Sequence, residues 1–206
     1  MQLSELRSEL ADLLHRSDLS DSQLNGFINR GCQTVGRIIR AIEAEASDTW
    51  TSASPALPAD FARMRYVTRP SGSGFFELKP MSALEAAKWS DASNSDSIGY
   101  LVTGTSMAVY PADASTHTIY YFKNPSTLSA DGDTNYLTVS FATISLYAAA
   151  VDGALWERDA QAQQAFQAHL SGLVELVNNE ADRQRAGSGL VAASHYQAET
   201  YLPRGM

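Results

Sequence analysis

The chain has 206 residues, of which 44% are hydrophobic, enough for one large domain or for a domain with an inserted unit. The 15 Lys and Arg residues against 23 Asp and Glu residues give a formal net charge of −8, which argues against a basic nucleic-acid-binding protein. The single cysteine, Cys32, excludes an intrachain disulfide framework, and we expect neither a signal peptide nor a membrane partner.

The first part of the chain has the apolar spacing of two helices. Leucines at three- and four-residue intervals predict a short amphipathic helix over residues 1–16. Ser20 and Gln23 have the spacing of a capping box, which predicts the start of a longer second helix. The apolar stripe of that helix keeps its phase to about residue 45 and consists of Leu24, Phe27, Ile28, Val35, Ile38, Ile39 and Ile42.

Between Ser47 and about Tyr136 the helical period disappears, and Pro, Gly, Ser, Thr and Asp become frequent. Short alternating runs in this part predict strands of a small antiparallel sheet or sandwich. The expected strands are Arg63–Arg69, Phe75–Lys79, Gly99–Thr103, Ser106–Tyr110 and His117–Phe122. Ser82 and Glu85 repeat the capping-box spacing, so we expect a short helix over Ser82–Trp89.

Helical periodicity returns after residue 136. One apolar stripe contains Ile144, Ala148, Val151 and Leu155. A second stripe begins at Phe166, and Asp159 is positioned to cap its helix. Residues 187–206 have no period, and Gly187–Gly189 is expected to form a hinge.

The order of these elements predicts an α+β fold, because the helices on either side of the β segment have only each other against which to bury their stripes. We expect a split helical bundle formed by residues 1–47 and 137–186, built from N-terminal and C-terminal helices. Residues 48–136 form an inserted antiparallel β module, and residues 187–206 form an extended C-terminal arm.

No motif for catalysis, metal binding or a cofactor stands out, so we expect no enzyme, no metal and no cofactor. The sequence has no serine-hydrolase elbow, phosphate-binding loop or dinucleotide fingerprint. Asp131, Asp133 and Asn135 alternate as in an EF-hand loop, but Tyr136 and Ala142 occupy positions that need Gly and Glu, which indicates a turn. No metal-ligand spacing links the histidines, which are His15, His117, His169 and His195.

Two groups of side chains are candidates for binding. At 100° per residue, Arg30, Arg37 and Arg40 lie within about 80° of one another on the second helix. They are suited either to contact phosphate or to form a solvated or subunit-facing helix side paired with acids. The aromatic run Tyr120–Phe122 is suited either to stack on a sugar or base, or to fill a core and an interface.

Several short sequence motifs occur in a particular order along the chain, between and within the predicted helices. Leu57-Pro58-Ala59-Asp60-Phe61 comes directly before a strand, followed by Tyr120–Pro125, Thr134–Leu137 and the Ala-rich stretch Tyr147–Ala150. From about residue 20 to residue 185, the chain resembles the head-to-tail adaptor proteins of tailed bacteriophages. It departs from that pattern in a looser segment after Pro125 and in its Gly-rich C-terminal end.

The resemblance implies a structural protein of the virion neck. Such adaptors form a homo-oligomeric ring, usually a dodecamer, which joins the portal protein to the tail or nozzle component and continues the DNA channel. DNA then passes through without sequence-specific binding, as an acidic lining favours. The resemblance implies assembly in the host cytoplasm and gives no catalytic residues.

Within such a ring, particular residues become candidates for contacts. Small residues such as Gly26, Gly31, Gly36 and Ala148–Ala150 are expected to allow close approach at joints between subunits. Arg30, Arg37 and Arg40 are candidates for the channel or for a subunit-facing side. The C-terminal arm is expected to dock on the portal or on a neighbouring copy through Leu190, Val191, Tyr196, Tyr201 and Leu202.

A second class of function stays open from the residues alone. A β module that binds a carbohydrate or a peptide, carried on a helical stalk, would use the tyrosines, and we would expect it to be monomeric. An enzyme would need convergent histidine or acidic residues that the spacing does not show.

Overall fold

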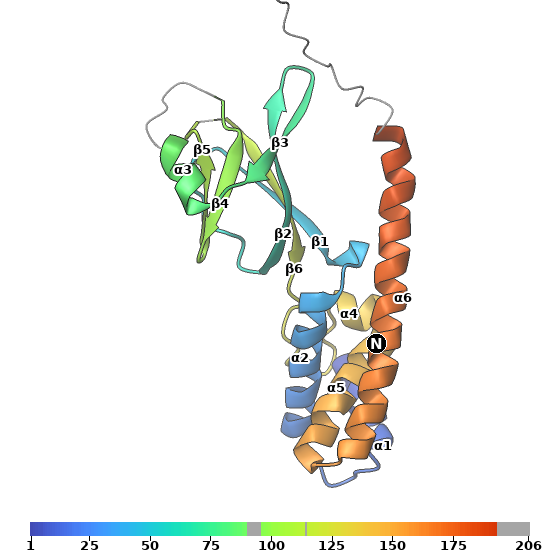
Figure 1. The fold of residues 1–206 in the computed structure, drawn as a ribbon. Helices are drawn as coiled ribbons and strands as arrows, with labels where there is room; N and C mark the ends of the chain where they lie inside the picture. Colours follow the sequence, from blue (N-terminus) through green and yellow to red (C-terminus); the bar gives the residue numbers. More distant parts are fainter. Residues whose placement is uncertain (90–95, 114, 193–206) are drawn as a thin grey trace, which may run out of the picture.

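Two hydrophobic cores divide the protein into a helical bundle and a β-sheet unit (Figure 1). The computed structural model describes residues 1–89, 96–113 and 115–192, with side chains up to residue 186. The bundle consists of α1 (Leu3–Leu13), α2 (Asp21–Ile38), α4 (Tyr136–Ser140), α5 (Ala142–Glu157) and α6 (Ala160–Ala192). Helix α6 has 33 residues and extends beyond the 16-residue α5.

The second unit follows α2 through the short 3-10 helix η1 (Ile42–Ala44). Its elements are β1 (Glu45–Trp50), β2 (Phe61–Ser71), β3 (Gly74–Pro80), α3 (Ala83–Trp89), β4 (Gly99–Thr103), β5 (Ser106–Tyr110) and β6 (His117–Lys123). The α+β fold with a sheet inserted between N-terminal and C-terminal helices is confirmed.

The expected helix starts are confirmed by their capping bonds. The Ser20 side chain accepts a hydrogen bond from the backbone N–H of Gln23 at 3.4 Å, and the Gln23 side-chain oxygen accepts one from the Ser20 backbone N–H at 2.9 Å. Asp159 accepts from the backbone N–H of Ala162 at 2.9 Å at the start of α6. These bonds satisfy backbone donors that have no partner within the first turn of a helix.

Helices α2 and α5 are in backbone contact. A Cβ added to Gly31 would lie 2.7 Å from the carbonyl carbon of Ala148 and 2.7 Å from the amide nitrogen of Ala149. Ala148, Ala149 and Ala150 are all buried in the bundle core. The expectation that Gly31 and these alanines serve joints between subunits is therefore wrong, because they pack within one subunit.

The sheet is mixed and curled. Its strand order is β1-β6-β2-β3-β4-β5, and every pair is antiparallel except β3 and β4. The expectation of a purely antiparallel module needs correction at that pair, because α3 forms the crossover that a parallel connection requires. Val109 and Met107 donate to the carbonyls of Ala53 and Pro55, each at 3.0 Å, so the segment after β1 covers the outer edge of β5.

All five expected strands are present, and β1 is an additional one. It pairs with β6 from Glu45↔Phe122 to Trp50↔His117, so the strands that enter and leave the sheet are neighbours. The expected phase of α2 beyond residue 38 is wrong, since Ile39 is extended with ψ 139°. Ile38 consequently remains 49% exposed while Ile39 is fully buried.

The expected hinge at Gly187–Gly189 is absent, because α6 continues through these residues to Ala192. Each glycine costs a helix about 1 kcal/mol relative to alanine, but glycine does not terminate a helix as proline does. The remainder of the expected arm, residues 193–206, lies outside the described residues.

Candidate assembly surface

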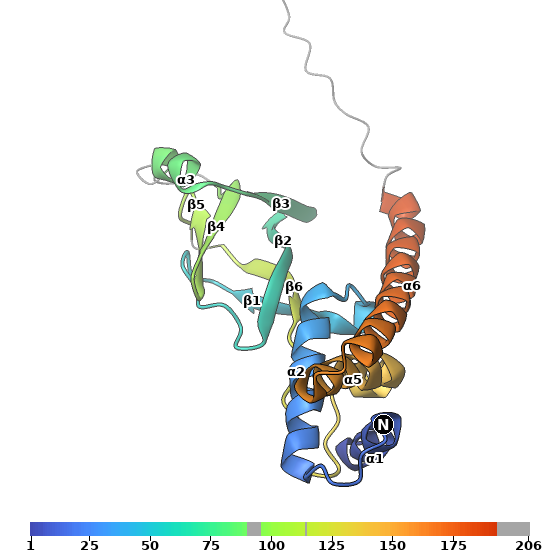
Figure 2. The ribbon, with the colours of Figure 1, turned by 60° about the horizontal axis from the view of Figure 1, so that its bottom comes forward.

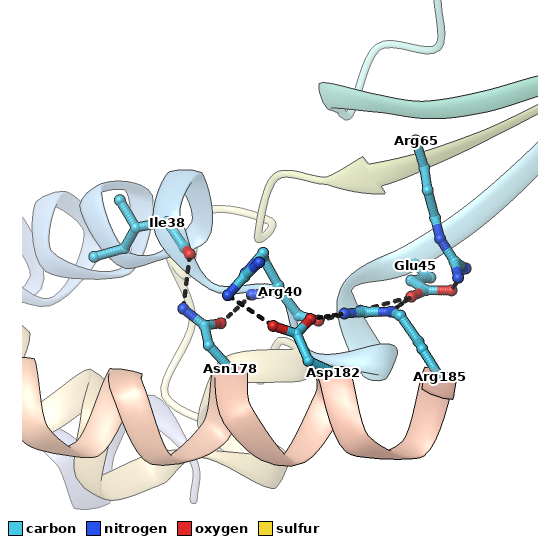
Figure 3. Close-up of polar contacts among 7 residues, drawn as sticks. All are labelled: Ile38, Arg40, Glu45, Arg65, Asn178, Asp182 and Arg185. Atoms are coloured by element: carbon cyan, nitrogen blue, oxygen red, sulfur yellow. Dashed lines mark hydrogen bonds and ion pairs between the residues drawn. The ribbon is translucent and has the colours of Figure 1, made fainter. Parts of the chain in front are cut away.

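The bundle and the sheet meet where α2 ends, β1 begins and α6 passes both (Figure 3). Asn178 of α6 bonds to both sides of the α2 end. Its Oδ1 accepts from the Arg40 backbone N–H at 2.6 Å, and its Nδ2 donates to the Ile38 carbonyl at 3.3 Å. One α6 side chain thus satisfies backbone groups that the end of a helix leaves without partners.

Ion pairs continue this junction toward the sheet (Figure 3). The Arg185 guanidinium lies 2.7 Å from Glu45 Oε1, and Arg65 of β2 pairs with the other oxygen of the same carboxylate. Asp182 binds Arg40 at 2.9 Å and Arg185 at 3.1 Å. Since the Glu45 side chain is only 21% exposed, these charges are partly desolvated, and such a network holds α6 and the sheet at one angle more firmly than surface pairs do.

Arg63 lies beside this network on β2. Its guanidinium is 4.5 Å from the centre of the Phe122 ring, which Arg185 also approaches, at 5.5 Å. Burial, together with the nearby positive charges of Arg40 and Arg185, lowers the pKa of Arg63. Within the described part of the chain, Arg63 forms no ion pair, so it adds an uncompensated positive charge to the junction.

The structure gives the three arginines predicted on the second helix different surroundings. Arg30 pairs with Asp152 of α5 at 2.7 Å, and Arg40 belongs to the junction. Arg37 is exposed and has no ion pair among the residues that the structure describes. They do not converge on one phosphate site, and their place in a channel or at a subunit contact stays a prediction.

The arm residues are only partly covered by the structure. Leu190 and Val191 belong to the last turn of α6, where the structure describes only the backbone. The other three residues, Tyr196, Tyr201 and Leu202, lie outside the described residues. Their predicted docking role is untested.

The expectation that Leu155 shares the buried stripe of Ile144 and Ala148 is wrong, since Leu155 is 57% exposed. Other large apolar side chains are exposed at places that the sequence analysis did not single out. They lie at the β2–β3 hairpin, on α3, at the end of α5 and on the outer side of α6, and they include Phe75 (78%), Leu84 (73%), Trp156 (50%) and Leu176 (67%). The Phe75-Phe76 pair directly after the Gly74 turn was a readable signal, because hairpin tips are normally polar. Exposed side chains of this size are typical of surfaces that contact other proteins.

A serine, a histidine and an aspartate meet inside the sheet unit without forming a catalytic triad. Ser97 Oγ lies 2.9 Å and Asp113 Oδ1 lies 3.4 Å from the same atom, His117 Nε2. In a nucleophilic triad the acid binds the other ring nitrogen, and here Nδ1 has no described partner. His117 is completely buried, and burial lowers its pKa. Asp113 also accepts from the backbone N–H groups of Ser97 and Ser115, at 2.7 and 2.8 Å.

The turn interpretation of the EF-hand-like segment is confirmed. The Asp133 carboxylate accepts backbone hydrogen bonds from Ser129 at 2.7 Å and Ala130 at 2.8 Å, which lower its pKa. Asn135 caps α4, and Asp131 pairs with Arg7. No group of three or more His, Cys, Asp or Glu residues suited to a metal occurs in the described ranges.

The tyrosines of the sheet contact one another and neighbouring side chains. Tyr66 and Tyr120 stack with ring centres 4.4 Å apart, and the Tyr121 hydroxyl donates to Asp60 at 2.9 Å. Burial, together with this bond, raises the pKa of Tyr121 to about 12. A groove of about 600 Å³ lies where the sheet meets the bundle, beside Asn124 and Asn135. Both amides donate to backbone carbonyls, so they hold the chain around the groove in place.

Two separate units, a charged junction between them and exposed apolar side chains on both are features of a protein that connects other proteins. The family model described as SU10 adaptor protein matches residues 1–193. The chain therefore belongs to this family of bacteriophage adaptor proteins. No curated protein matches the chain. Among the described helices, none is long and apolar enough to cross a membrane.

Proposed function

We propose that this adaptor forms a closed ring in the virion neck, where it joins the portal protein to the tail or nozzle component and continues the DNA channel. The observation that carries the proposal is the family match over residues 1–193. A ring subunit needs two different surfaces that meet head to tail. The elongated shape, with a bundle at one end and a sheet at the other, provides well separated surfaces for such contacts (Figure 1).

The charge of the chain suits a channel component. A formal net charge of −8 per subunit, repeated around a ring, repels DNA phosphates and lets the genome slide during packaging and ejection. In this proposal the DNA is a passing cargo that is not bound by sequence. The adaptor then acts as a structural protein of the virion, assembled in the host cytoplasm, without an enzymatic role.

The parts of the chain have separate tasks in this proposal. The bundle, built mainly from residues 1–47 and 137–186, carries the ring, and the inserted β module contacts neighbours or the tail. The module was expected over residues 48–136, but its first strand begins at Glu45, and Tyr136 already belongs to α4 of the bundle. Residues 187–206 form the docking arm. Its apolar residues are too few for a core but sufficient to anchor a segment on a partner, and they are Leu190, Val191, Tyr196, Tyr201 and Leu202.

Truncation after Ala186 tests the arm. Ordering a free segment costs roughly 1–2 kcal/mol per residue, so docking occurs only where a partner buries the anchors. We expect the truncated chain to keep the melting temperature of the isolated subunit and to assemble poorly with the portal. Normal incorporation into particles would exclude the docking role, and a large loss of subunit stability would show that the arm packs on its own bundle.

The ring itself is tested by light scattering coupled to size-exclusion chromatography, with and without the purified portal. Because a portal can template the ring, the free chain is allowed to be monomeric. We expect a defined oligomer on the portal. A chain that stays monomeric in the presence of the portal and does not bind it would contradict the proposal, and would favour the ligand-binding alternative.

A further inference from the structure

Four arginines from three parts of the chain gather at the junction between bundle and sheet. Arg40, Arg63, Arg65 and Arg185 gather there, while the carboxylates that pair with them are those of Glu45 and Asp182. We call these four arginines the basic corner. In a chain with a formal net charge of −8, an arginine of this group that has no ion-pair partner attracts an acidic group of another molecule.

Arg63 has no ion-pair partner among the described residues. It lies beside Arg40 and Arg185 and over the face of Phe122, at 4.5 Å from the ring centre. Arg40 and Arg185 are each paired with a carboxylate, whereas no described carboxylate pairs with Arg63. Arg63 is exposed, and its guanidinium lies on an aromatic ring beside other cations. It can therefore donate hydrogen bonds to a carboxylate of another molecule.

A matching acidic surface lies on α1. Glu5, Glu9 and Asp12 are exposed and follow the spacing i, i+4 and i+7, which places them on one side of the helix. We call them the acidic face. Arg7, the arginine within α1, is buried and pairs with Asp21 and Asp131, so it does not neutralise this face.

No basic side chain in the described part of the chain pairs with the acidic face. None of its three carboxylates forms an ion pair with a described residue, and Glu5 accepts only the backbone N–H of Gln2 at 2.8 Å among the described bonds. Like charges four residues apart destabilise a helix slightly. A basic partner would remove this repulsion.

The two surfaces lie on different sides of the molecule. In both views α1 lies on the side of the bundle that faces away from the sheet, whereas the basic corner is where the bundle meets the sheet (Figures 1 and 2). Two different, complementary surfaces on one chain are what a head-to-tail contact between identical subunits requires, whereas a contact using one surface twice would bring like charges together.

We propose that the basic corner of one copy receives the acidic face of α1 from the next copy in the ring. The proposal rests on the proposed function, because it names the surfaces by which that ring closes. A second copy fits better than an unrelated acidic protein, since every subunit then has both of its charged surfaces covered and the contact repeats until the ring is complete.

A charge exchange tests this contact with the full chain and the purified portal. One variant carries Arg63→Glu, a second carries Glu9→Lys together with Asp12→Lys, and a third carries all three changes. Glu5 is retained because its carboxylate caps the helix. The number of adaptor copies on each portal is counted by native mass spectrometry.

We expect each of the first two variants to lose ring occupancy by about tenfold or more, since like charges would face one another across every contact. The third variant restores opposite charges and should recover occupancy to within about threefold of the unmodified chain. Arg183→Glu is the matched control for the basic side and Glu175→Lys for the acidic side, because both residues are exposed on α6.

Normal occupancy for Arg63→Glu, or no recovery in the third variant, would overturn this contact while leaving the ring proposal intact. If the unmodified chain itself forms no ring on the portal, the proposed function fails instead. Thermal melts of each variant separate loss of assembly from loss of folding, and we expect them to match the unmodified chain within a few degrees, because the changed side chains are exposed.

Discussion

Replacing Gly31 by alanine tests the close contact between α2 and α5. The added Cβ would lie 2.7 Å from backbone atoms of Ala148 and Ala149, closer than van der Waals contact allows, and backbone atoms cannot swing aside. Overpacking of this kind costs about 1–3 kcal/mol, and the better helix propensity of alanine returns up to about 1 kcal/mol. We expect a net destabilisation of roughly 1–2 kcal/mol.

Gly26→Ala is the matched control in the same helix. There the added Cβ would meet the end of the flexible Arg30 side chain at 3.1 Å, so the side chain can move and the propensity gain remains. For a chain of this length 1 kcal/mol corresponds to about 2–4 °C in melting temperature. Differential scanning calorimetry should show Gly31→Ala melting several degrees lower and Gly26→Ala slightly higher. An equal rise in both variants would refute the helix contact described here.

Three further predictions concern burial and charge. Ile39→Asp should cost several kcal/mol in chemical denaturation because Ile39 is fully buried, whereas Ile38→Asp at a 49% exposed position should cost little. Glu45→Gln removes the negative charge between Arg65 and Arg185 and should cost roughly 1–3 kcal/mol in the same assay. Burial lowers the pKa of His117 below its ordinary value of 6.5, so as the pH falls the unfolded chain is protonated before the folded chain. The contribution of His117 to stability should therefore be complete above about pH 6.5 and decrease below it. Between about pH 7 and pH 5, the melting temperature should fall less in His117→Gln than in the unmodified chain.

Helix starts were predictable because the residues that cap a helix are close in sequence. Ser20 with Gln23, and Asp159 before α6, occur at fixed spacings and form the bonds that those spacings predict. The strands with alternating or aromatic side chains were predictable for the same local reason. β1 was missed because its residues are mostly polar and exposed, and its place is fixed by pairing with β6, more than 60 residues away in the chain.

The surface features depend on long-range contacts, which periodicity does not reveal. Glu45 and Arg185 are 140 residues apart in sequence, and the arginines of the junction come from three different parts of the chain. The role of Gly31 was misjudged for a related reason. A glycine within a helix indicated that another backbone passes close to Gly31. Whether that backbone belongs to the same subunit or to the next one depends on how α5 packs.

The most direct test of the central claim is a cryo-electron microscopy map of the virion neck at a resolution that allows the chain to be traced. The account predicts a closed ring of copies of this chain between the portal and the tail, with the bundle and the curled sheet of each copy recognisable and the channel continuous through the ring. A neck that lacks this chain, or that holds isolated copies which do not contact one another around the channel, would contradict it.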